Sequence, residues 1–270
     1  MGAIRPITVA GLPDALVVKP GSKIKFSKYK PGFTTDDKKS TALGVLEKNT
    51  TKIAELQRVL SAQKEHALLI ILQGMSTAGK DGTIRGVLGK TEPQGHQVTH
   101  FKEPTSDELA HDYLWRIHKH IPPKGTIGIF NRSHYEDILE PKVKSEVSKR
   151  EIEKRYRQIN DFERMLSENG IRLLKFFLYI GKKERRKRLA ERGEEKPWKL
   201  TKQDFKEGKL WDKYIQAYED VINNCSTEWA PWHIIPANYK WFRNLAISEI
   251  ILKTLREMEL EYPEPSFDIS

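Results

Sequence analysis

The stretch LLIILQGMSTAGKDGTIRGVL, residues 68–88, places a glycine-rich turn between an apolar run and a helix-like segment. Four residues separate Gly74 from Gly79, and Lys80 follows directly. This order is typical of a loop whose backbone N–H groups surround phosphate oxygens. Lys80 and the helix N-terminus would add positive charge. We therefore expect a phosphate-binding loop made of Gly74, Ser76, Thr77, Ala78, Gly79, Lys80, Asp81 and Gly82.

Position 81 departs from the usual form of such a loop, because it carries an aspartate where Ser or Thr is common. The usual hydroxyl is a ligand for the Mg²⁺ that bridges the phosphates. A carboxylate is also a hard oxygen ligand, which Mg²⁺ accepts directly or through water. We expect Asp81 to be a candidate metal ligand beside a bound phosphate. The alternative is a plain glycine turn next to a solvated lysine.

Short apolar runs alternate with helix-like segments over the rest of the chain. Five runs predict buried strands, at 67–72, 97–101, 126–130, 173–180 and 233–237. Apolar periodicity and capping signals predict helices between them, at 39–64, 105–118, 148–169 and 201–223. Such alternation is typical of an α/β protein with one doubly wound, mostly parallel sheet.

The domain organisation follows from the same pattern. Residues 1–40 are rich in Pro, Gly and Lys and predict an irregular N-terminal arm. Residues 41–258 form the expected core, with a basic segment at about 182–208, and residues 259–270 form an irregular tail. No internal repeat or low-complexity linker interrupts the core, so we expect one α/β domain.

A second polar cluster follows the apolar run at 126–130. The guanidinium of Arg132 can hold phosphate oxygens bidentately. Because ligands gather at the carboxyl ends of parallel strands, Arg132 should face the same crevice as the loop. Glu136 and Asp137 lie about one turn further on, where they could help to hold Mg²⁺ or position an acceptor. The alternatives are a salt bridge between Arg132 and one of these acids, and ordinary acidic residues at a helix N-terminus.

The segment KKERRKRLAERGEEKPWK, residues 182–199, is strongly basic. On a helix, Arg185, Arg188 and Arg192 share one face. Since the segment follows a predicted core strand, it lies where a mobile lid would bring arginines over transferring phosphates. Two other interpretations remain open: a solvated charged face, and a grip on a long polyanion.

Composition limits the classes of protein that need consideration. The chain has 270 residues, and 47 Lys and Arg against 37 Asp and Glu give a net charge of +10, which implies an anionic partner. No apolar run approaches the roughly 20 residues that span a bilayer, so a membrane-spanning class is excluded. The single cysteine, Cys225, cannot form an internal disulfide and fits a reducing cytoplasm. No recognisable nucleic-acid-binding module accompanies the basic run.

Taken together, these segments resemble the polyphosphate kinase 2 family, in particular the branch that phosphorylates nucleoside mono- and diphosphates. The resemblance extends from about residue 25 to 258 and is carried by LLIILQGMSTAGKDGTI, PQGHQVTHFKEPTSDELAHDYLWRIHKHIP, GTIGIFNRSHYED and STEWAPWHIIPANYKWFRNLA. It implies a three-layer α/β/α P-loop kinase-like fold, with a mostly parallel five-stranded sheet and a helical lid. It also implies Mg²⁺-dependent, reversible transfer of the terminal phosphoryl group of inorganic polyphosphate to AMP or ADP in the cytoplasm.

The resemblance also implies roles for the candidate residues. Lys80, Arg132 and Asp137 would be catalytic, with the first two on the transferring phosphoryl group. Asp81 and Asp137 would be candidate ligands for Mg²⁺ or Mn²⁺, and the arginines of the basic segment would be lid cations. Polyphosphate and adenine or guanine nucleotides are the expected partners, without membrane or nucleic acid. Exposed aromatic residues near the 150–169 helix would suit a homo-oligomer, either a dimer or a tetramer.

Ser76 departs from the family loop, which usually reads Gly-x-Asp-x-x-Gly-Lys. A hydroxyl can ligate Mg²⁺ but contributes no charge, so metal retention should weaken and transfer should be reduced but not abolished. Three other functions stay open at this point: an ATP-dependent nucleoside monophosphate kinase, a nucleic-acid-binding protein, and a catalytically weak homologue that binds polyphosphate.

Overall fold

Five parallel strands form one sheet in the order β2–β3–β1–β4–β5. The structure is a computed structural model that describes residues 8–265; the ends of the expected arm and tail, residues 1–7 and 266–270, lie outside this range. Each strand lies within two residues of its predicted range, which confirms the predicted sheet. The strands are β1 (Ala67–Gln73), β2 (His96–His100), β3 (Ile127–Asn131), β4 (Ile171–Tyr179) and β5 (Trp232–Pro236).

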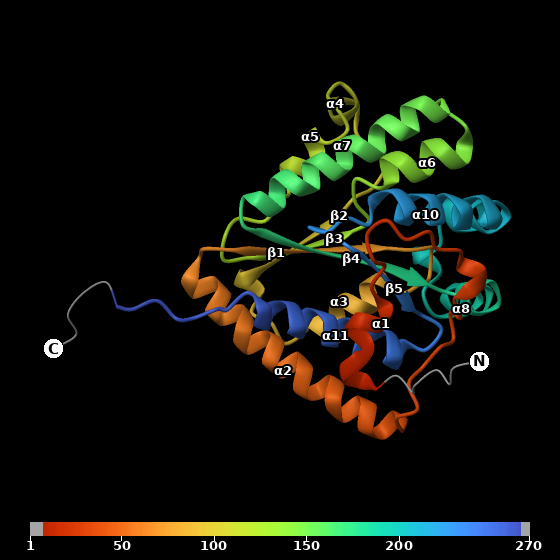
Figure 1. The fold of residues 1–270 in the computed structure, drawn as a ribbon. Helices are drawn as coiled ribbons and strands as arrows, with labels where there is room; N and C mark the ends of the chain where they lie inside the picture. The colour runs from red at the N-terminus through yellow and green to blue at the C-terminus, as the bar shows by residue number, and fades with distance from the viewer. Residues whose placement is uncertain (1–7, 266–270) are drawn as a thin grey trace.

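Helices cover both faces of the sheet and give the expected three layers. Figure 1 shows α2, α3 and α11 on one face, and α6, α7 and α10 on the other. The fold is therefore the predicted α/β/α arrangement. The helices are α1 (Leu12–Leu16), α2 (Lys39–Gln63), α3 (Lys80–Leu88), α4 (Ser106–Leu109), α5 (Trp115–His118), α6 (Glu136–Lys144), α7 (Lys149–Glu168), α8 (Lys182–Glu195), α9 (Lys202–Lys209), α10 (Trp211–Cys225) and α11 (Lys240–Glu257).

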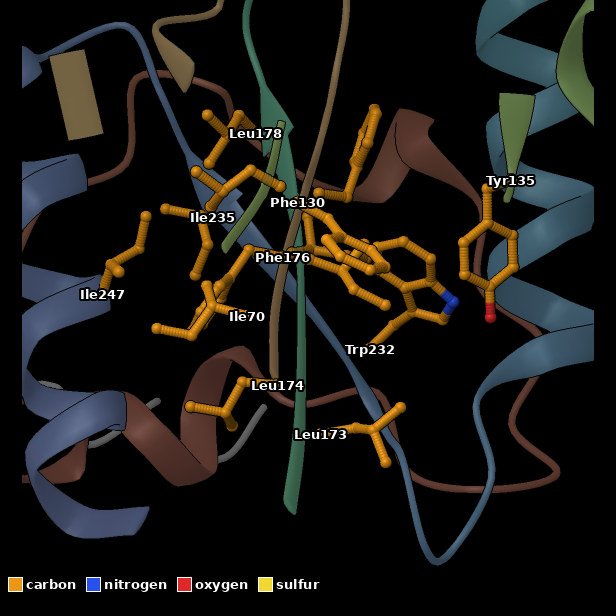
Figure 2. Packing of buried hydrophobic residues seen from close by; sticks show 14 of the residues in the cluster. Ile70, Phe130, Tyr135, Leu173, Leu174, Phe176, Leu178, Trp232, Ile235 and Ile247 are labelled. Carbon is orange, nitrogen blue, oxygen red and sulfur yellow. The ribbon is translucent and has the colours of Figure 1, made fainter. Parts of the chain in front are cut away.

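The central strand β1 is the rigid base from which the glycine-rich turn leaves the sheet. All of its residues are buried, and it pairs with β3 on one side and β4 on the other. Ile70 of β1 lies among the packed side chains that Figure 2 shows, together with Phe130 and Phe176 of these neighbouring strands. A fully apolar strand between two partners stabilises the sheet by burying large apolar areas.

Strand β2 differs from the expectation of a buried strand. It lies at the edge of the sheet, and Val98 is 46% exposed. The other edge strand, β5, is buried because the N-terminal arm covers it: Val18 N donates to Trp232 O at 2.7 Å, and Val17 pairs with His233. The arm is thus not wholly irregular, since it contains the short helix α1 and contributes Leu12 to the core.

Two predicted helices are interrupted. The capping box at Thr105 is present, but α4 ends at Leu109, and a new helix starts after Asp112, whose Oδ1 accepts from the backbone N–H groups of residues 114 and 115. The capping box at Thr201 is also present, and a break at Leu210 separates α9 from α10. Side-chain acceptors and caps end one helix and begin another within each predicted range. Apolar periodicity does not reveal these breaks.

The aromatic residues of α7 are not available for an interface. Tyr156 and Phe162 are 7% and 8% exposed, because they pack against the core of this chain. The expected support for a homo-oligomer from this helix is therefore wrong. Among residues 8–265, no helix is long and apolar enough to cross a membrane.

Candidate active site

The glycine-rich turn between β1 and α3 has the backbone of an anion-binding loop. Gly74, Thr77 and Gly79 adopt positive φ angles of 148°, 66° and 111°. A Cβ added at Gly74 would lie 2.9 Å from the carbonyl oxygen of Leu178, so only glycine fits beside β4. These turns direct successive N–H groups toward one side of the loop. The predicted phosphate loop is thus present as a backbone conformation.

Two buried arginines hold the opposite, carbonyl side of the loop. Arg188 Nη1 donates to Thr77 O at 3.2 Å and to Ala78 O at 3.3 Å, and Arg243 Nη1 donates to Ala78 O at 3.2 Å. Burial lowers the pKa of Arg243 to about 10. A Cβ at Gly79 would lie 1.8 Å from Arg243 Nη1, so the second glycine makes room for this support. Arg188, an expected lid cation, is therefore placed beneath the loop rather than over it.

Lys80 begins α3 and folds back over the loop. Its Nζ donates to Gly74 O at 2.7 Å. Burial and the positive charge of Arg132 lower its pKa to about 8, although the carboxylates of Glu207 and Glu136 act in the opposite direction. Glu136 and Glu207 act on both Lys80 and Arg132, which places the two cations in one electrostatic environment. A bound polyanion would raise the pKa of Lys80 again, because a nearby negative charge favours the protonated amine.

Arg132 lies at the end of β3, next to the loop. Its N–H donates to Leu72 O at 3.1 Å, and its φ of 65° is in the left-handed region that non-glycine residues rarely adopt. The guanidinium contacts Glu136 at 3.2 Å and Glu207 at 3.3 Å. The predicted salt bridge and the predicted position beside the loop therefore both occur. The charge of Glu136 raises the pKa of Arg132, which stays a cation throughout.

A buried ion pair fixes the turn that carries Arg132. Tyr135 Oη donates to Glu163 Oε1 at 2.9 Å, and His134 Nε2 lies 3.1 Å from the same oxygen. Lys175 of β4 contacts the other oxygen of Glu163 at 2.5 Å. These groups are fully buried, so loss of one partner would leave an uncompensated charge. The strained Arg132 conformation thus rests on packed elements from both sides.

Two acids from α9 enter the phosphate loop. The N–H of Ser76 donates to Glu207 Oε2 at 2.7 Å, and the Ser76 hydroxyl donates to Asp204 Oδ1. Arg192 lies 3.6 Å from Asp204, and Arg185 donates to the Asp204 backbone carbonyl. The arginines predicted to close over phosphate therefore have different partners: Arg192 faces a carboxylate at the loop, whereas Arg185 and Arg188 bind backbone carbonyls.

Asp81 and Asn131 form the side of the loop that suits a metal ion. Asn131 Nδ2 donates to Asp81 Oδ1 at 2.7 Å, and Lys199 lies 3.8 Å from the other oxygen. Burial raises the pKa of Asp81, but the hydrogen bond from Asn131 and the nearby lysines outweigh it and leave the pKa lowered. The Asn131 Oδ1 atom is buried and has no hydrogen-bond partner within residues 8–265. An ionised carboxylate and a free amide oxygen are both suitable oxygen ligands for Mg²⁺.

Asp137 lies in a separate cavity of about 610 Å³ next to the loop. Arg116 Nη2 contacts its carboxylate at 3.1 Å. Burial raises the pKa of Asp137, and Arg116 opposes that rise. The lining includes aromatic and cationic side chains from several elements, among them Phe101, Tyr113, Arg116, Arg132, Lys144 and Arg155. The lining also carries acids, so the cations of the cavity are accompanied by carboxylates: Glu103, Glu108, Asp112, Glu136, Asp137, Glu140 and Glu146. A cavity of this size can hold a small molecule, and its arginines can exchange carboxylates for phosphate oxygens.

The structure brings most predicted residues together and adds others. Ser76, Lys80, Asp81 and Arg132 meet at one edge of the sheet, whereas Asp137 lies with Arg116. The two acids predicted as metal ligands have different partners, and no cluster of three His, Cys, Asp or Glu placed to hold a metal occurs in the described part of the chain. The sequence did not single out Arg116, Glu207 and Arg243. Arg116 and Arg243 lie within segments that carry the family resemblance, so that resemblance was the available signal for them, whereas Glu207 lies outside these segments.

Comparisons with known proteins identify the family and agree with the fold. The family model described as "Polyphosphate kinase 2 (PPK2)" matches residues 36–263. An AMP/ADP-polyphosphate phosphotransferase of Meiothermus ruber is 45% identical over 252 residues, covering 92% of this chain and 94% of that protein. An ADP-polyphosphate phosphotransferase of Rhodopseudomonas palustris is 40% identical over 82% of this chain and 81% of its own length. The crystal structure of polyphosphate kinase 2 from Arthrobacter aurescens TC1 superposes with a TM-score of 0.92 at 38% identity, covering 100% of this chain and 96% of that one.

Proposed function

The chain belongs to the polyphosphate kinase 2 family, and on that premise we propose that it transfers the terminal phosphoryl group of inorganic polyphosphate to AMP or ADP. The relatives named as AMP/ADP- and ADP-polyphosphate phosphotransferases support both acceptors. The reaction is an in-line displacement, in which an acceptor phosphate oxygen attacks the terminal phosphorus and the shortened polyphosphate leaves. It needs no covalent enzyme intermediate and runs in either direction.

The position of Arg132 carries this proposal. Its guanidinium lines the acceptor cavity and also contacts Glu207, which is bound to the N–H of Ser76 in the phosphate loop. One cation therefore stands between the loop and the cavity. A phosphoryl group that moves from a donor on the loop to an acceptor in the cavity would pass this residue. Charge neutralisation by a fixed guanidinium is the main help that such a transfer needs.

The loop side would hold the donor. N–H groups of residues 76–80 and the N-terminus of α3 would bind terminal phosphates, with Lys80 on the transferring group. Arg192 lies near Asp204 of α9, and Lys199 lies near Asp81 at the start of α3. Both cations would bind the following phosphates of the polyphosphate chain. Because polyphosphate carries about one charge per phosphate, this binding would be mostly electrostatic and sensitive to salt.

The cavity side would hold the acceptor nucleotide. Arg116 and Arg155 would meet its phosphate, and Phe101 and Tyr113 offer apolar surface for the rest of the nucleotide. Asp137 would orient the attacking phosphate through Arg116, to which it is bound at 3.1 Å. Guanine nucleotides are a second acceptor class that this cavity can be tested with.

Mg²⁺, or Mn²⁺ in its place, would be held at Asp81 and at the unpartnered Oδ1 of Asn131. When bound, the metal neutralises charge on the donor phosphates. Ser76 would add a hydroxyl and no charge. These residues therefore fit a metal on the donor side. They supply one negative charge, from Asp81, whereas a loop with aspartate at position 76 as well would supply two.

A donor–acceptor matrix tests the proposed function. Purified protein with Mg²⁺ is given polyphosphate or ATP as donor and AMP, ADP, GMP or GDP as acceptor, and products are separated by chromatography. We expect ADP and ATP to form from polyphosphate. Formation of ADP from AMP with ATP alone would instead indicate a nucleoside monophosphate kinase. Retention of polyphosphate without turnover of any pair would indicate a binding homologue.

A further inference from the structure

The phosphate loop is occupied by the chain itself. Glu207 is 4% exposed and accepts from the Ser76 N–H at 2.7 Å through Oε2. Its other oxygen accepts from Arg132 Nη2 at 3.3 Å. Burial raises the pKa of this carboxyl group, and the positive charge of Lys80, whose Nζ donates to Gly74 O at 2.7 Å in the same loop, acts less strongly in the opposite direction. A loop N–H, the loop lysine and Arg132 are the groups that a donor phosphate would use.

We propose that Glu207 is an internal substitute for phosphate, which closes the loop in the absence of polyphosphate and must be displaced before the donor binds. This inference rests on the proposed function, because it concerns how the same site is regulated. A carboxylate is a planar anion that satisfies inward N–H groups as a phosphate oxygen does. Two anions cannot share these donors without repulsion, so binding of polyphosphate and insertion of Glu207 exclude each other.

Asp204 attaches the same helix to the loop at a second point. Its Oδ1 accepts from the Ser76 hydroxyl, while its Oδ2 accepts from the Thr201 N–H at 2.8 Å as part of the cap of α9. One carboxylate thus fixes both the start of the helix and the loop. The backbone of α9 is also held by Arg185, which donates to Asp204 O. Displacement of Glu207 should therefore move α9 as a unit.

Ser76 makes this closed state possible. Its hydroxyl donates a hydrogen bond to the carboxylate of Asp204, a residue that is 6% exposed. An aspartate at position 76 would place a second carboxylate against Asp204, and like charges in a buried site repel strongly. The residue that weakens metal binding on the donor side therefore stabilises the inserted helix. Serine in place of the aspartate usual in the family loop therefore lowers metal affinity and also stabilises the state in which Glu207 is inserted.

Hydrogen–deuterium exchange of the ligand-free protein tests the contact without any substrate. We compare the peptide containing Ser76 in the wild-type chain, in Glu207→Ala and in Glu195→Ala. Glu195 is an exposed acid at the end of α8 that makes no ion pair among residues 8–265, so its loss changes net charge equally. We expect about tenfold faster exchange of the loop in Glu207→Ala only. Equal exchange in all three proteins would overturn the proposal.

Binding of inorganic polyphosphate, measured by calorimetry without nucleotide, tests the competition. Glu207→Gln keeps the size of the side chain and removes its charge, and Glu195→Gln is the matched control. Because the competent open state becomes more populated, the dissociation constant should fall about tenfold for Glu207→Gln. The control should change it less than about twofold at moderate salt. An unchanged or higher dissociation constant for Glu207→Gln would show that Glu207 does not compete with the donor.

The two proposals fail in different ways. If the proposed function is wrong, the wild-type chain makes no ADP from polyphosphate and AMP, but the exchange result in the ligand-free protein still decides whether Glu207 closes the loop. If only the inference is wrong, turnover occurs and both Glu207 variants match their controls. Thermal melting of each variant, within a few degrees of wild type, establishes that the folded proteins are compared.

Discussion

The donor and acceptor sides of the site are built in opposite ways, although they lie at the ends of neighbouring strands. The loop after β1 is closed: its N–H group at Ser76 binds Glu207, and its lysine binds Gly74 O. The region beyond β3 is an open cavity of about 610 Å³. A nucleotide can enter a space that already exists, whereas a polyanion must replace groups that are already bound. The two substrates therefore meet different barriers.

Arginine residues mark the same difference. Arg188 and Arg243 are buried and donate to carbonyl oxygens of the loop, so they fix its shape. Within residues 8–265, the partners of the Arg132 and Arg192 guanidinium groups are carboxylates, which phosphate oxygens can replace. Residues of one type thus serve as scaffold or as substrate ligand according to what they bind in the free protein.

The largest expected effect is the loss of the loop lysine. Lys80→Met removes the cation on the transferring group while the loop backbone stays in place, so we expect about a thousandfold lower kcat with every acceptor. The measurement is the initial rate of ADP and ATP formation. Lys90→Met, which removes an exposed cation two residues beyond the end of α3, is the control and should retain full activity. Comparable rates in both variants would contradict a donor role for the loop.

A change in the cavity should separate the two sides. Arg116→Met removes a charged partner from Asp137 and from the acceptor phosphate, which is worth about 1.5–3 kcal/mol, so kcat/KM for AMP should fall about tenfold to a hundredfold. Polyphosphate binding without nucleotide should stay unchanged. Lys119→Met, at an exposed position of the same segment, is the control. An equal loss of polyphosphate affinity in Arg116→Met would show that donor and acceptor share one binding site.

The Ser76→Asp variant tests whether position 76 controls loop closure and metal binding on the donor side. The added carboxylate repels Asp204 and supplies a metal ligand, so we expect a smaller population of the closed loop and about a tenfold faster transfer at low Mg²⁺. The rate is measured over a series of Mg²⁺ concentrations. Ser76→Asn, which is similar in size without the charge, is the control. If Ser76→Asp is no faster at any Mg²⁺ concentration, position 76 does not limit the reaction.

The smallest expected effect is a pH dependence confined to the donor. Lys80 has a pKa lowered to about 8, so it is charged in the free protein below that pH and loses its proton above it. Bound polyphosphate favours the charged form, and affinity should therefore be constant below pH 8 and fall a few-fold as pH rises beyond it. Lys80→Arg should abolish this fall, since arginine stays charged. AMP affinity should not show the same change.

The sequence predicts the sheet and the loop because both depend on local patterns. The run at 67–72 is short and continuously apolar, as is typical of a buried strand, and Gly74, Gly79 and Lys80 follow at a fixed spacing. The partners of the basic segment could not be predicted from the sequence. Arg185, Arg188 and Arg192 share a helix face, but tertiary packing decides that the first two bind backbone carbonyls and the third faces a carboxylate. Glu207 and Arg243 reach the loop from distant elements. Arg243 lies in a family-like segment whose sequence does not show that it contacts the loop, and Glu207 lies in no such segment.

The central claim is that Lys80 and Arg132 act on the same phosphoryl group, one from the loop and one from the next strand end. A double-mutant cycle tests it directly, with kcat/KM for polyphosphate and AMP measured for the wild type, Lys80→Met, Arg132→Gln and the double variant. We expect the double variant to lose far less than the product of the two single losses, because residues that act as a unit are not additive. Losses that multiply would show that the two cations act on different groups.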